Sequence, residues 1–277
     1  MWVYFDTEEN TAAFNMAMDE AFAEAIIKNP ALSVIRTYSW KPKAISIGYF
    51  QNAIRDFNID KIKKSKIDFV RRTTGGRAVF HANEFTYSTV SHIDNTLLGN
   101  NLRDTYNVIG LAILKALHMS GFSKLELKKI NTSDNISKTV KPCFSSTGRY
   151  EIVYKNKKIV GSAQKRTRNI IQQHGSILLG NEHLKIIDFM NISDTEKKIQ
   201  KKILMENSTS LSNIVKREIF YKELSAVFVK GFEETFKQKI KSPPLPQNII
   251  KRTLELAKTK YSSPEWNFKT ITSLQVI

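Results

Sequence analysis

The chain has 277 residues, enough to bury one substantial core, either as a single large domain or as a main domain with a small appendage. Its 43 lysines and arginines against 26 acidic residues give a formal net charge of +17. This charge predicts attraction to acidic partners, such as nucleic acid, anionic membranes or acidic proteins, without choosing among them. The single cysteine excludes an intrachain disulfide and any multi-cysteine metal site.

The distribution of charged and apolar residues along the chain argues against nucleic acid and membranes as partners. Much of the excess charge is lysine in segments such as residues 61–66 and 196–202, which have no interleaved aromatic side chains. Such runs are typical of a solvated face, so we expect no nucleic acid partner. The N-terminus lacks a basic region followed by an apolar one, and no segment approaches about 18 uninterrupted apolar residues. We therefore expect a cytoplasmic protein with no membrane partner.

The first half of the chain predicts alternating helices and strands. Apolar residues at helical spacing indicate an amphipathic helix over residues 12–28 with Thr11 as its N-cap. Within it, the polar residues Asn15, Asp19 and Glu20 are not explained by the periodicity. Further patterns predict strands over residues 33–40, 44–50, 68–73 and 85–92, and helices over 59–66 and 103–119, the last with Gly121 as its C-cap.

The second half changes from strands to helices. Residues 124–142 are lysine-rich and nonperiodic, which indicates a long surface loop with one possible short strand. Residues 149–166 predict a hairpin and residues 169–180 another strand, whereas the pattern is helical from Asp194 onward, interrupted by prolines in residues 242–247. We predict a mixed α/β fold with a largely antiparallel sheet flanked by helices in residues 1–193. Residues 194–277 are expected to form a helical segment packed on the same domain.

Common nucleotide and hydrolase motifs are missing. Gly75 and Gly76 follow a predicted strand, but neither GxxxxGK[ST] nor GxGxxG is present, which argues against a nucleotide-phosphate loop. The Gly161-Ser162-Ala163 sequence resembles half of a GxSxG elbow, yet it lies on a hairpin strand, so we do not expect Ser162 to be a nucleophile.

The histidines do not have metal-ligand spacing, and we expect no metal site. They occur singly, without an HExxH or Cys/His pattern. His81 differs from the others because it lies in the stretch RRTTGGRAVFHANEF, among arginines and glycines. The five histidines are His81, His92, His118, His174 and His183.

Cys143 has two interpretations. It follows a proline at the end of the lysine-rich loop and is either a small buried hydrophobe or a reactive thiol. A thiol, with an ordinary pKa of about 8.5, must be partly ionised to attack, and a neighbouring lysine ammonium stabilises the anion. The residue pattern alone does not say which lysine lies close to it.

A series of segments runs from the first residues almost to the last. They are NMAMDEA (15–21), SIGYFQ (46–51), RRTTGGRAVFHANEFTYS (71–88), PCF (142–144), YEIVYKNKKIVGSAQKR (150–166), QHGSILL (173–179) and KYSSPEWNF (260–268). In this order and spacing they resemble the lipoyl and octanoyl transfer enzymes of the biotin/lipoate protein ligase superfamily. Each segment is modest alone, but their combination is highly specific, and it implies the catalytic-domain fold of that superfamily.

Two positions make the chain resemble the cysteine-dependent octanoyltransferases of this superfamily more than its ATP-using lipoate ligases. The ligases carry a third glycine after the Gly-Gly pair and no catalytic cysteine, whereas this chain has Arg77 and Cys143. The resemblance implies that Cys143 is the nucleophile and that Lys158, in the KxxGSA segment, is its catalytic partner. It also implies a binding site for the acyl substrate formed by Arg72, Gly75, Gly76, Arg77, His81, Gly161, Ser162, Ala163 and His174.

The resemblance also implies a reaction and its partners. Such enzymes take octanoate from octanoyl-acyl carrier protein, through a cysteine thioester, and attach it to a lysine of a lipoyl domain such as the glycine cleavage H protein. No cofactor other than the donor's octanoyl-phosphopantetheine is expected, and we expect a monomer. Acidic carrier proteins would be steered toward the basic surface. The apolar residues Ala78 to Phe80 are expected to face the acyl chain.

The resemblance is imperfect at two positions and leaves other activities open. Ala82 and Ser145 replace acidic residues of the family pattern, so the hydrogen bonds of those carboxylates are expected to be either absent or supplied elsewhere, for instance by Asn83 or Glu84. Alternatives are an ATP-dependent lipoate ligase, an amidotransferase that moves octanoate between lipoyl domains, and a noncatalytic protein that binds acylated partners or nucleic acid.

Overall fold

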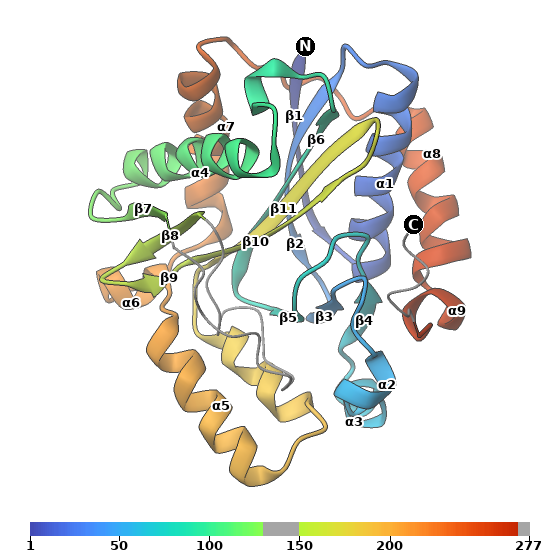
Figure 1. Cartoon of the computed structure of the whole chain (residues 1–277), viewed down its shortest axis with the longest axis vertical. Coiled ribbons are helices and arrows are strands. Elements are labelled where there is room, and N and C mark those ends of the chain that lie inside the picture. The colour runs from blue at the N-terminus through green and yellow to red at the C-terminus, as the bar shows by residue number, and fades with distance from the viewer. Residues whose placement is uncertain (130–149, 271–277) are drawn as a thin grey trace.

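The architecture is built around a twisted five-stranded sheet. The computed structural model describes residues 1–129 and 150–270 (Figure 1). The strand order is β1-β2-β6-β11-β10, in which β1 and β2 are parallel and the other neighbours are antiparallel. The strands are β1 Trp2–Asn10, β2 Ser33–Trp40, β6 Glu84–His92, β10 Val160–Arg166 and β11 Ile170–Leu178.

Two three-stranded sheets flank this central sheet. In one, β3 pairs with β4 in parallel and with β5 in antiparallel orientation. In the other, β7, β8 and β9 are antiparallel. Their bounds are β3 Ala44–Ile47, β4 Asp68–Arg71, β5 Val79–His81, β7 Glu126–Lys129, β8 Tyr150–Tyr154 and β9 Lys157–Lys158.

Helices cover both faces of the central sheet. Figure 1 shows α4 and α7 on one face and α1 and α8 on the other, with α5 below the sheet. The α-helices are α1 Ala12–Lys28, α2 Ala53–Asp56, α3 Ile59–Lys64, α4 Leu102–Met119, α5 Asp194–Asn207, α6 Leu211–Val215, α7 Tyr221–Phe236, α8 Gln247–Leu256 and α9 Pro264–Asn267. Shorter turns are the 3₁₀ segments η1 Thr96–Leu98 and η3 Glu182–Phe189 and the π segment η4 Ala257–Tyr261.

The period-two alternation of the strands divides the apolar residues into two cores. In β1, Trp2 and Tyr4 join the core beneath α4 and α7, whereas Val3 and Phe5 join the core beneath α1 and α8. Successive side chains of a strand point to opposite faces, so a strand covered on both sides reads as continuously apolar. A third core packs the β3-β4-β5 sheet against η3, with Phe80 stacked on Phe189.

Most predicted elements are confirmed, with small shifts at their ends. Thr11 caps α1 by accepting a hydrogen bond from the Phe14 amide, and Gly121 follows α4 with a φ of +92°. Strand β1 was not predicted, and the strands that begin at Ser33 and Ala44 belong to different sheets. The predicted loop 124–142 contains β7, and its remaining residues 130–142 lie outside the described part of the chain.

Helix α1 is also the attachment point of the last helices. Arg252 of α8 makes a two-pronged ion pair with Glu24, and Lys260 of η4 contacts Glu20 at 2.7 Å. The segment from Asp194 is helical, and the division into residues 1–193 and 194–277 stays a prediction. Within the described ranges, no helix is both long and apolar enough to cross a membrane.

The crossing of α4 and α7 depends on the absence of a side chain at Gly231. A Cβ at this position would lie 2.2 Å from the carbonyl oxygen of Ala112 and 2.7 Å from the amide nitrogen of Ala116. We predict that Gly231→Ala forces the helices apart and lowers the free energy of unfolding by about 1–3 kcal/mol, measured by urea denaturation. Lys230→Ala, at an exposed neighbouring position, should change it by less than about 0.5 kcal/mol. Equal effects of the two substitutions would contradict this account.

Candidate active site

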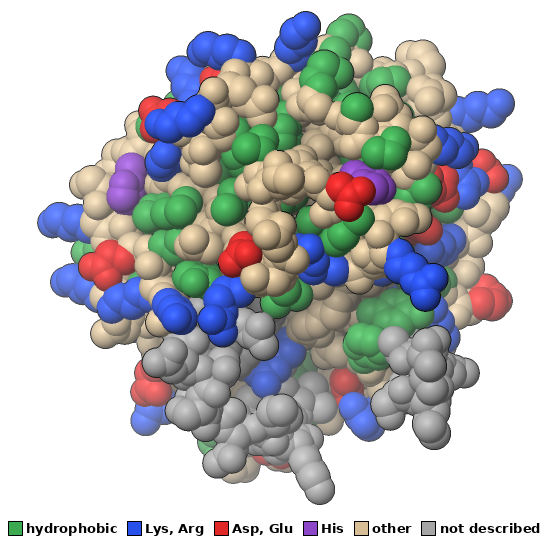
Figure 2. All heavy atoms as spheres, turned by 45° about the horizontal axis from the view of Figure 1, so that its top comes forward, with side chains coloured by type: hydrophobic (Ala, Val, Ile, Leu, Met, Phe, Trp, Pro, Cys, Tyr) green, Lys and Arg blue, Asp and Glu red, His purple; other side chains and the backbone are tan. Residues whose placement is uncertain are grey.

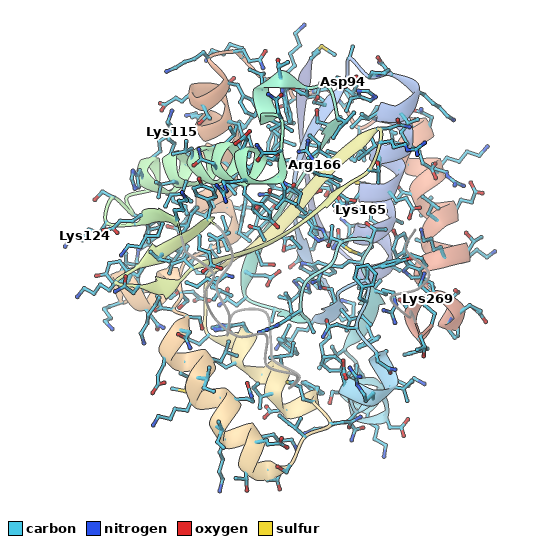
Figure 3. All side chains as sticks on the ribbon, in the orientation of Figure 1. Asp94, Lys115, Lys124, Lys165, Arg166 and Lys269 are labelled. Atoms are coloured by element: carbon cyan, nitrogen blue, oxygen red, sulfur yellow. The ribbon has the colours of Figure 1, made fainter. Side chains whose placement is uncertain are left out.

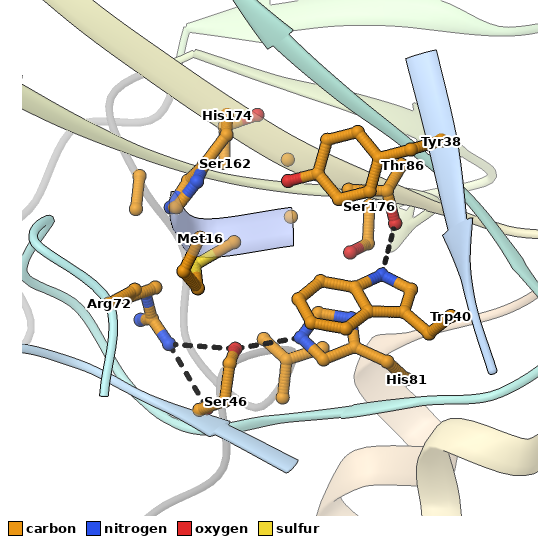
Figure 4. A pocket seen from close by; sticks show the side chains of 14 residues that line it. Met16, Tyr38, Trp40, Ser46, Arg72, His81, Thr86, Ser162, His174 and Ser176 are labelled. Atoms are coloured by element: carbon orange, nitrogen blue, oxygen red, sulfur yellow. Dashed lines mark hydrogen bonds between the residues drawn. The ribbon is translucent and has the colours of Figure 1, made fainter. Parts of the chain in front are cut away.

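A narrow pocket opens between the central sheet and the β3-β4-β5 sheet (Figure 4). Residues far apart in the chain meet there because β10 and β11 form one wall and β2, β3 and β5 form the others. The lining residues are Met16, Tyr38, Trp40, Ser46, Arg72, Val79, His81, Thr86, Gly161, Ser162, Ala163, His174, Gly175 and Ser176.

The β10-β11 wall is set by strand register and by a close backbone approach. Ala163 pairs with His174, and Ser162 pairs with Gly175. A Cβ on Gly175 would lie 2.6 Å from the carbonyl oxygen of Gly161 and 2.7 Å from the Tyr87 ring, so only glycine fits at this position. The Ser162 hydroxyl lies 2.8 Å from the Tyr87 hydroxyl, which fixes its orientation.

His81 is held from three sides. Its ring stacks on Trp40 with a centroid distance of 3.9 Å, and its Nε2 lies 2.7 Å from the Ser46 hydroxyl (Figure 4). Its Nδ1 lies 2.5 Å from the carboxylate of Glu84. A carboxylate on one ring nitrogen and a hydroxyl on the other define the tautomer and orientation of an imidazole. The geometry is that of a preorganised proton donor or acceptor.

Glu84 is the acidic residue at the base of this arrangement. Its Oε1 accepts hydrogen bonds from the hydroxyls of Thr86 and Ser176 in addition to its contact with His81. Ala82 is the position at which the sequence resemblance leads one to expect an acidic residue. The carboxylate of Glu84, at the start of β6, contacts the histidine, and its role as a substitute for that acidic residue stays a prediction.

Arg72 lines the pocket and also holds the glycine loop in shape. Its Nη2 donates to the carbonyl oxygens of Gly75 and Arg77 at 2.9 and 2.8 Å, and its Nη1 donates to the Ser46 carbonyl at 3.1 Å. Gly76 has a φ of +90°, which favours glycine. The guanidinium thus joins the loop to β3, on the same side of the pocket as His81.

A second buried network lies beneath His174. Arg36 donates to Asp19 at 2.9 Å, and the other carboxylate oxygen of Asp19 lies 3.5 Å from Nδ1 of His174. Nε2 of His174 lies 2.7 Å from the Thr74 hydroxyl. Arg36 also donates to the side chain of Asn15, so Asn15 and Asp19, two of the three polar residues of α1 that helical periodicity left unexplained, belong to this network, whereas Glu20 contacts Lys260.

Burial and charge act in opposite directions on Asp19 and His174. Burial alone raises the pKa of Asp19, but His174 and the Arg36 guanidinium outweigh it, and the pKa of Asp19 lies below its ordinary value. Burial lowers the pKa of His174, although Asp19 opposes the shift. At neutral pH the network therefore holds an ionised Asp19, a charged Arg36 and a neutral His174 at the edge of the pocket.

Lys158 lies where the chain passes from the β7-β8-β9 sheet to the central sheet. It lies on β9, is buried, and forms an ion pair with Glu151 of β8 at 2.5 Å. The turn that brings the two together contains Lys155 and Asn156, both with positive φ, as predicted for a tight hairpin. Lys158 lies three residues before Gly161, outside the set that lines the pocket.

The structure brings together most of the residues predicted from the sequence. Arg72, His81, His174 and the residues of the GSA segment line one pocket, whereas Gly75, Gly76 and Arg77 form the loop beside it. The prediction that residues 78–80 face the acyl chain is wrong in part. Val79 lines the pocket, but Ala78 and Phe80 point into the core against η3, because successive side chains of a strand alternate. Cys143 and Ser145 lie outside the described residues.

Several site residues were not predicted from the sequence. The aromatic and hydroxyl side chains of β2, β3 and β6 match the composition of ordinary strands. The one signal that distinguishes them is that their polar groups are buried. Among the described residues, no group of three or more metal-ligating side chains converges. The residues added by the structure are Met16, Tyr38, Trp40, Ser46, Thr86, Gly175, Ser176 and, through their contacts, Asp19, Arg36 and Glu151.

The fold and the pocket define the class of protein, and comparison with known proteins agrees. Residues 11–233 match the family described as "Lipoyl protein ligase A/B catalytic domain". The chain belongs to this family. Individual relatives include "Octanoyltransferase LipM" of Lysinibacillus sphaericus (strain C3-41), which is 32% identical over 272 residues, or 97% of this chain and 99% of that protein. The protein of the same name from Clostridioides difficile (strain 630) is 33% identical over 274 residues, or 97% and 98% of the two chains.

Solved structures show the same fold at lower sequence identity. A bi-partite lipoate protein ligase from Thermoplasma acidophilum superposes with a TM-score of 0.78 at 21% identity and covers 98% of this chain and 97% of that chain. A lipoate-protein ligase A bound with ATP gives a TM-score of 0.75 at 21% identity, with 98% of each chain covered. The predicted fold of the superfamily is therefore confirmed.

The Arg36–Asp19 pair yields a prediction about stability. Asp19→Asn keeps the shape of the side chain but leaves a buried guanidinium without its counter-charge, which should lower the free energy of unfolding by about 3–5 kcal/mol at pH 7. Because the folded-state pKa of Asp19 is depressed, its contribution is complete above the ordinary carboxyl pKa and is lost as pH falls through the folded-state value. Asp94→Asn, at an exposed carboxylate, is the matched control and should have little effect under urea denaturation. A comparable loss in both variants would refute the role of the buried pair.

Proposed function

We propose that the protein is an octanoyltransferase of lipoate biosynthesis that transfers octanoate from octanoyl-acyl carrier protein to a lysine of a lipoyl domain, through a thioester on Cys143. The observation that carries the proposal is the pocket in which His81, His174, Arg72 and the GSA strand converge in a chain whose near-full-length relatives are named octanoyltransferases. The reaction takes place in the cytoplasm, and its acceptor is a small lipoyl-domain protein of the glycine cleavage H type.

The pocket suits an acyl chain that ends in a polar reacting group. Apolar surface comes from Met16, Val79 and the rings of Tyr38 and Trp40. Polar groups gather where His81, Ser46 and Arg72 meet. Ligand pockets commonly combine an apolar lining with a few fixed polar groups that orient the reacting end. The acyl chain would lie along the apolar side, with its carbonyl toward the polar groups.

In the first half of the proposed reaction, the Cys143 thiolate attacks the carbonyl carbon of the donor thioester. The Lys158 ammonium stabilises the thiolate, and Glu151 orients the lysine through their short contact. The tetrahedral intermediate collapses with loss of the donor's thiol and leaves octanoate on Cys143. Backbone amides of the Gly76–Arg77 and Gly161–Ala163 segments are candidates to stabilise the oxyanion. Exchange of one thioester for another is nearly isoenergetic, so the step consumes no ATP.

In the second half, the acceptor lysine attacks the Cys143 thioester and forms an amide. The donor's thiol leaves in the first half with a proton taken from Lys158, so that the lysine amine, or a water molecule, can now accept the proton that the attacking ammonium must lose. The Cys143 thiolate then leaves and the enzyme is restored. The energy of the thioester drives the formation of the more stable amide, and again no nucleotide is needed. An ATP-dependent lipoate ligase would instead activate free lipoate as an adenylate.

The acyl-enzyme gives the proposal a direct test. Incubation with octanoyl-acyl carrier protein, without ATP, should add about 126 Da to the intact protein, as expected for a covalent octanoyl group. Because the chain has one cysteine, hydroxylamine-labile adduct at neutral pH reports on Cys143 alone. Cys143→Ala should lose both the adduct and octanoyl transfer to an apo lipoyl domain. Mass spectrometry and a gel-shift assay of the acceptor make the measurements.

Other results of these adduct and transfer assays would identify a ligase, an amidotransferase or a noncatalytic protein. Activity of Cys143→Ala with ATP and free lipoate would identify a ligase. Transfer from an octanoylated lipoyl domain, with none from the acyl carrier protein, would identify an amidotransferase. Absence of any adduct or transfer with all donors would favour a noncatalytic binding protein.

Adjacent lysines provide a matched test of the catalytic pair. Lys158→Gln removes the cation proposed to stabilise the thiolate, so adduct formation at pH 7 should slow by roughly 100-fold and its pH profile should move to higher pH. Lys157→Gln removes the same charge one residue earlier, where the ammonium donates to the Met205 carbonyl, and should change the rate by less than about threefold. Stopped-flow or quenched mass spectrometry measures the rate, and equal slowing in the two variants would exclude a specific role for Lys158.

A further inference from the structure

Lysines gather around Trp266 at the edge of the β3-β4-β5 sheet. The Lys269 ammonium lies 3.6 Å from the Trp266 ring centroid and 4.7 Å from the centroid of Tyr49. The Lys260 ammonium lies 4.1 Å from the same Trp266 ring. Cation–π contacts with these rings hold both ammonium groups in place. We call Lys165, Lys260 and Lys269, with Trp266, the lysine cluster.

Positive charge exceeds negative charge in this cluster. Glu20 is the carboxylate that contacts the cluster, and it is already engaged by Lys260 at 2.7 Å and by the hydroxyl of Tyr261. Glu24, the next carboxylate along α1, is occupied by the two-pronged contact with Arg252. Among the described residues, no hydrogen bond or ion pair joins Lys165 or Lys269 to a carboxylate.

The environment disfavours charged Lys165 and Lys269. Burial lowers the pKa of Lys165, Lys260 lowers it further, and Glu20 opposes the shift. Burial also lowers the pKa of Lys269, followed by the charges of Arg71, Lys260 and Lys165. Lys269 is therefore repelled by three other cations, and Lys165 by Lys260. A bound anion would offset this repulsion and restore the charged forms.

Lys165 connects the lysine cluster to the lining of the pocket. Lys165 is two residues after the pocket-lining Ala163, on the same face of β10, and Lys165 pairs with Gln172. Gln172 accepts a hydrogen bond from the Thr73 hydroxyl. Figure 3 shows Lys165 and Lys269 on the side of the molecule that carries α1 and α9, with Lys115 and Lys124 on the opposite side.

The glycine loop, residues 75–77, and the adjacent Thr74 connect Lys269 to the pocket. The amide of Tyr49, whose ring lies beneath Lys269, donates to the carbonyl of Thr74 at 2.9 Å. Thr74 in turn contacts the pocket-lining His174. A Cβ on Gly76 would lie 3.7 Å from that of Ala163, so the loop and β10 are in contact. A ligand in the pocket that extends past this contact would meet Lys165 and Lys269.

We propose that Lys165 and Lys269 form a binding site for the phosphate group of the donor's phosphopantetheine arm. The inference rests on the proposed function. The arm carries the thioester at one end and a phosphodiester at the other, joined by a flexible chain with amide groups. With the acyl chain in the pocket, the thioester lies at its mouth and the phosphodiester lies outside it. Ammonium groups at that exit, of which Lys269 is held by its contacts with Trp266 and Tyr49, would make charge-assisted hydrogen bonds to phosphate oxygens.

Donors that differ only in the phosphate give the test. Octanoyl-phosphopantetheine and octanoyl-pantetheine carry the same thioester, so both should acylate Cys143. We expect the wild-type protein to show roughly a tenfold lower KM for the phosphorylated donor, with a similar kcat. In Lys165→Gln/Lys269→Gln the two donors should have the same KM, whereas kcat should stay near the wild-type value. Added salt should reduce the wild-type difference.

Controls separate a local site from general surface charge. Lys115→Gln/Lys124→Gln removes the same charge from the opposite side and should keep the tenfold preference. Lys165→Arg/Lys269→Arg should retain much of it, because the cations remain. Octanoyl-coenzyme A serves as a third donor. Equal KM values for octanoyl-phosphopantetheine and octanoyl-coenzyme A would agree with recognition of the shared phosphate.

Three results would overturn the inference. The first is equal wild-type KM values for the phosphorylated and unphosphorylated donors, and the second is an equal loss of preference in the control double variant. The third is a preference confined to octanoyl-coenzyme A, which would assign the cluster to a nucleotide. These outcomes leave the proposed function standing as long as adduct forms on Cys143. A protein that forms no adduct with any donor fails at the proposed function itself.

Discussion

The buried ion pair between Arg36 and Asp19 is the interaction on which the site depends. Arg36 extends from β2 beneath the sheet and binds α1 through Asp19 and Asn15, while Asp19 also contacts His174 of β11. One pair of charges therefore fixes the distance between the helix and the strands whose side chains line the pocket. Burying a charge is costly unless it is paired. Rotating α1 about its axis would separate Asp19 from Arg36, so the ion pair favours one rotation of this helix. The apolar residues of α1 alone would define that rotation less sharply, because its buried surface surrounds much of the helix.

Arg71 and Arg72, which are adjacent in the chain, bind different segments beside the pocket. Arg72 joins the glycine loop to β3, whereas Arg71 donates to backbone carbonyls that include those of Tyr49 and Lys269. A rigid guanidinium with several N–H groups can satisfy carbonyls that no regular secondary structure pairs. Arg72 thus holds the glycine loop itself, while Arg71 joins the segment after β3 to the segment that contains Lys269. Such positioning limits the loss of entropy when a ligand binds, since the loop is already ordered.

Sequence patterns predicted the elements of this fold better than its assembly. Alternation and helical spacing identified α1, α4, β2 and β6 within a few residues, because each carries its periodicity locally. Strand β1 was missed, since its second half is acidic and its pairing with β2 in parallel depends on a partner more than 20 residues away. In the site, His81 and Arg72 could be identified from their motif. Glu151 and Trp40 could not, because their roles arise from contacts between strands that no local pattern encodes.

The stacking of Trp40 on His81 has an optical consequence. The fluorescence of an indole depends on the groups that surround the ring. The indole nitrogen of Trp40 donates to Thr86, whose hydroxyl in turn contacts Glu84, so one edge of the ring is fixed while His81 covers one face. The protein therefore carries an intrinsic fluorophore in the lining of its pocket, and a ligand that enters the pocket changes the surroundings of that ring.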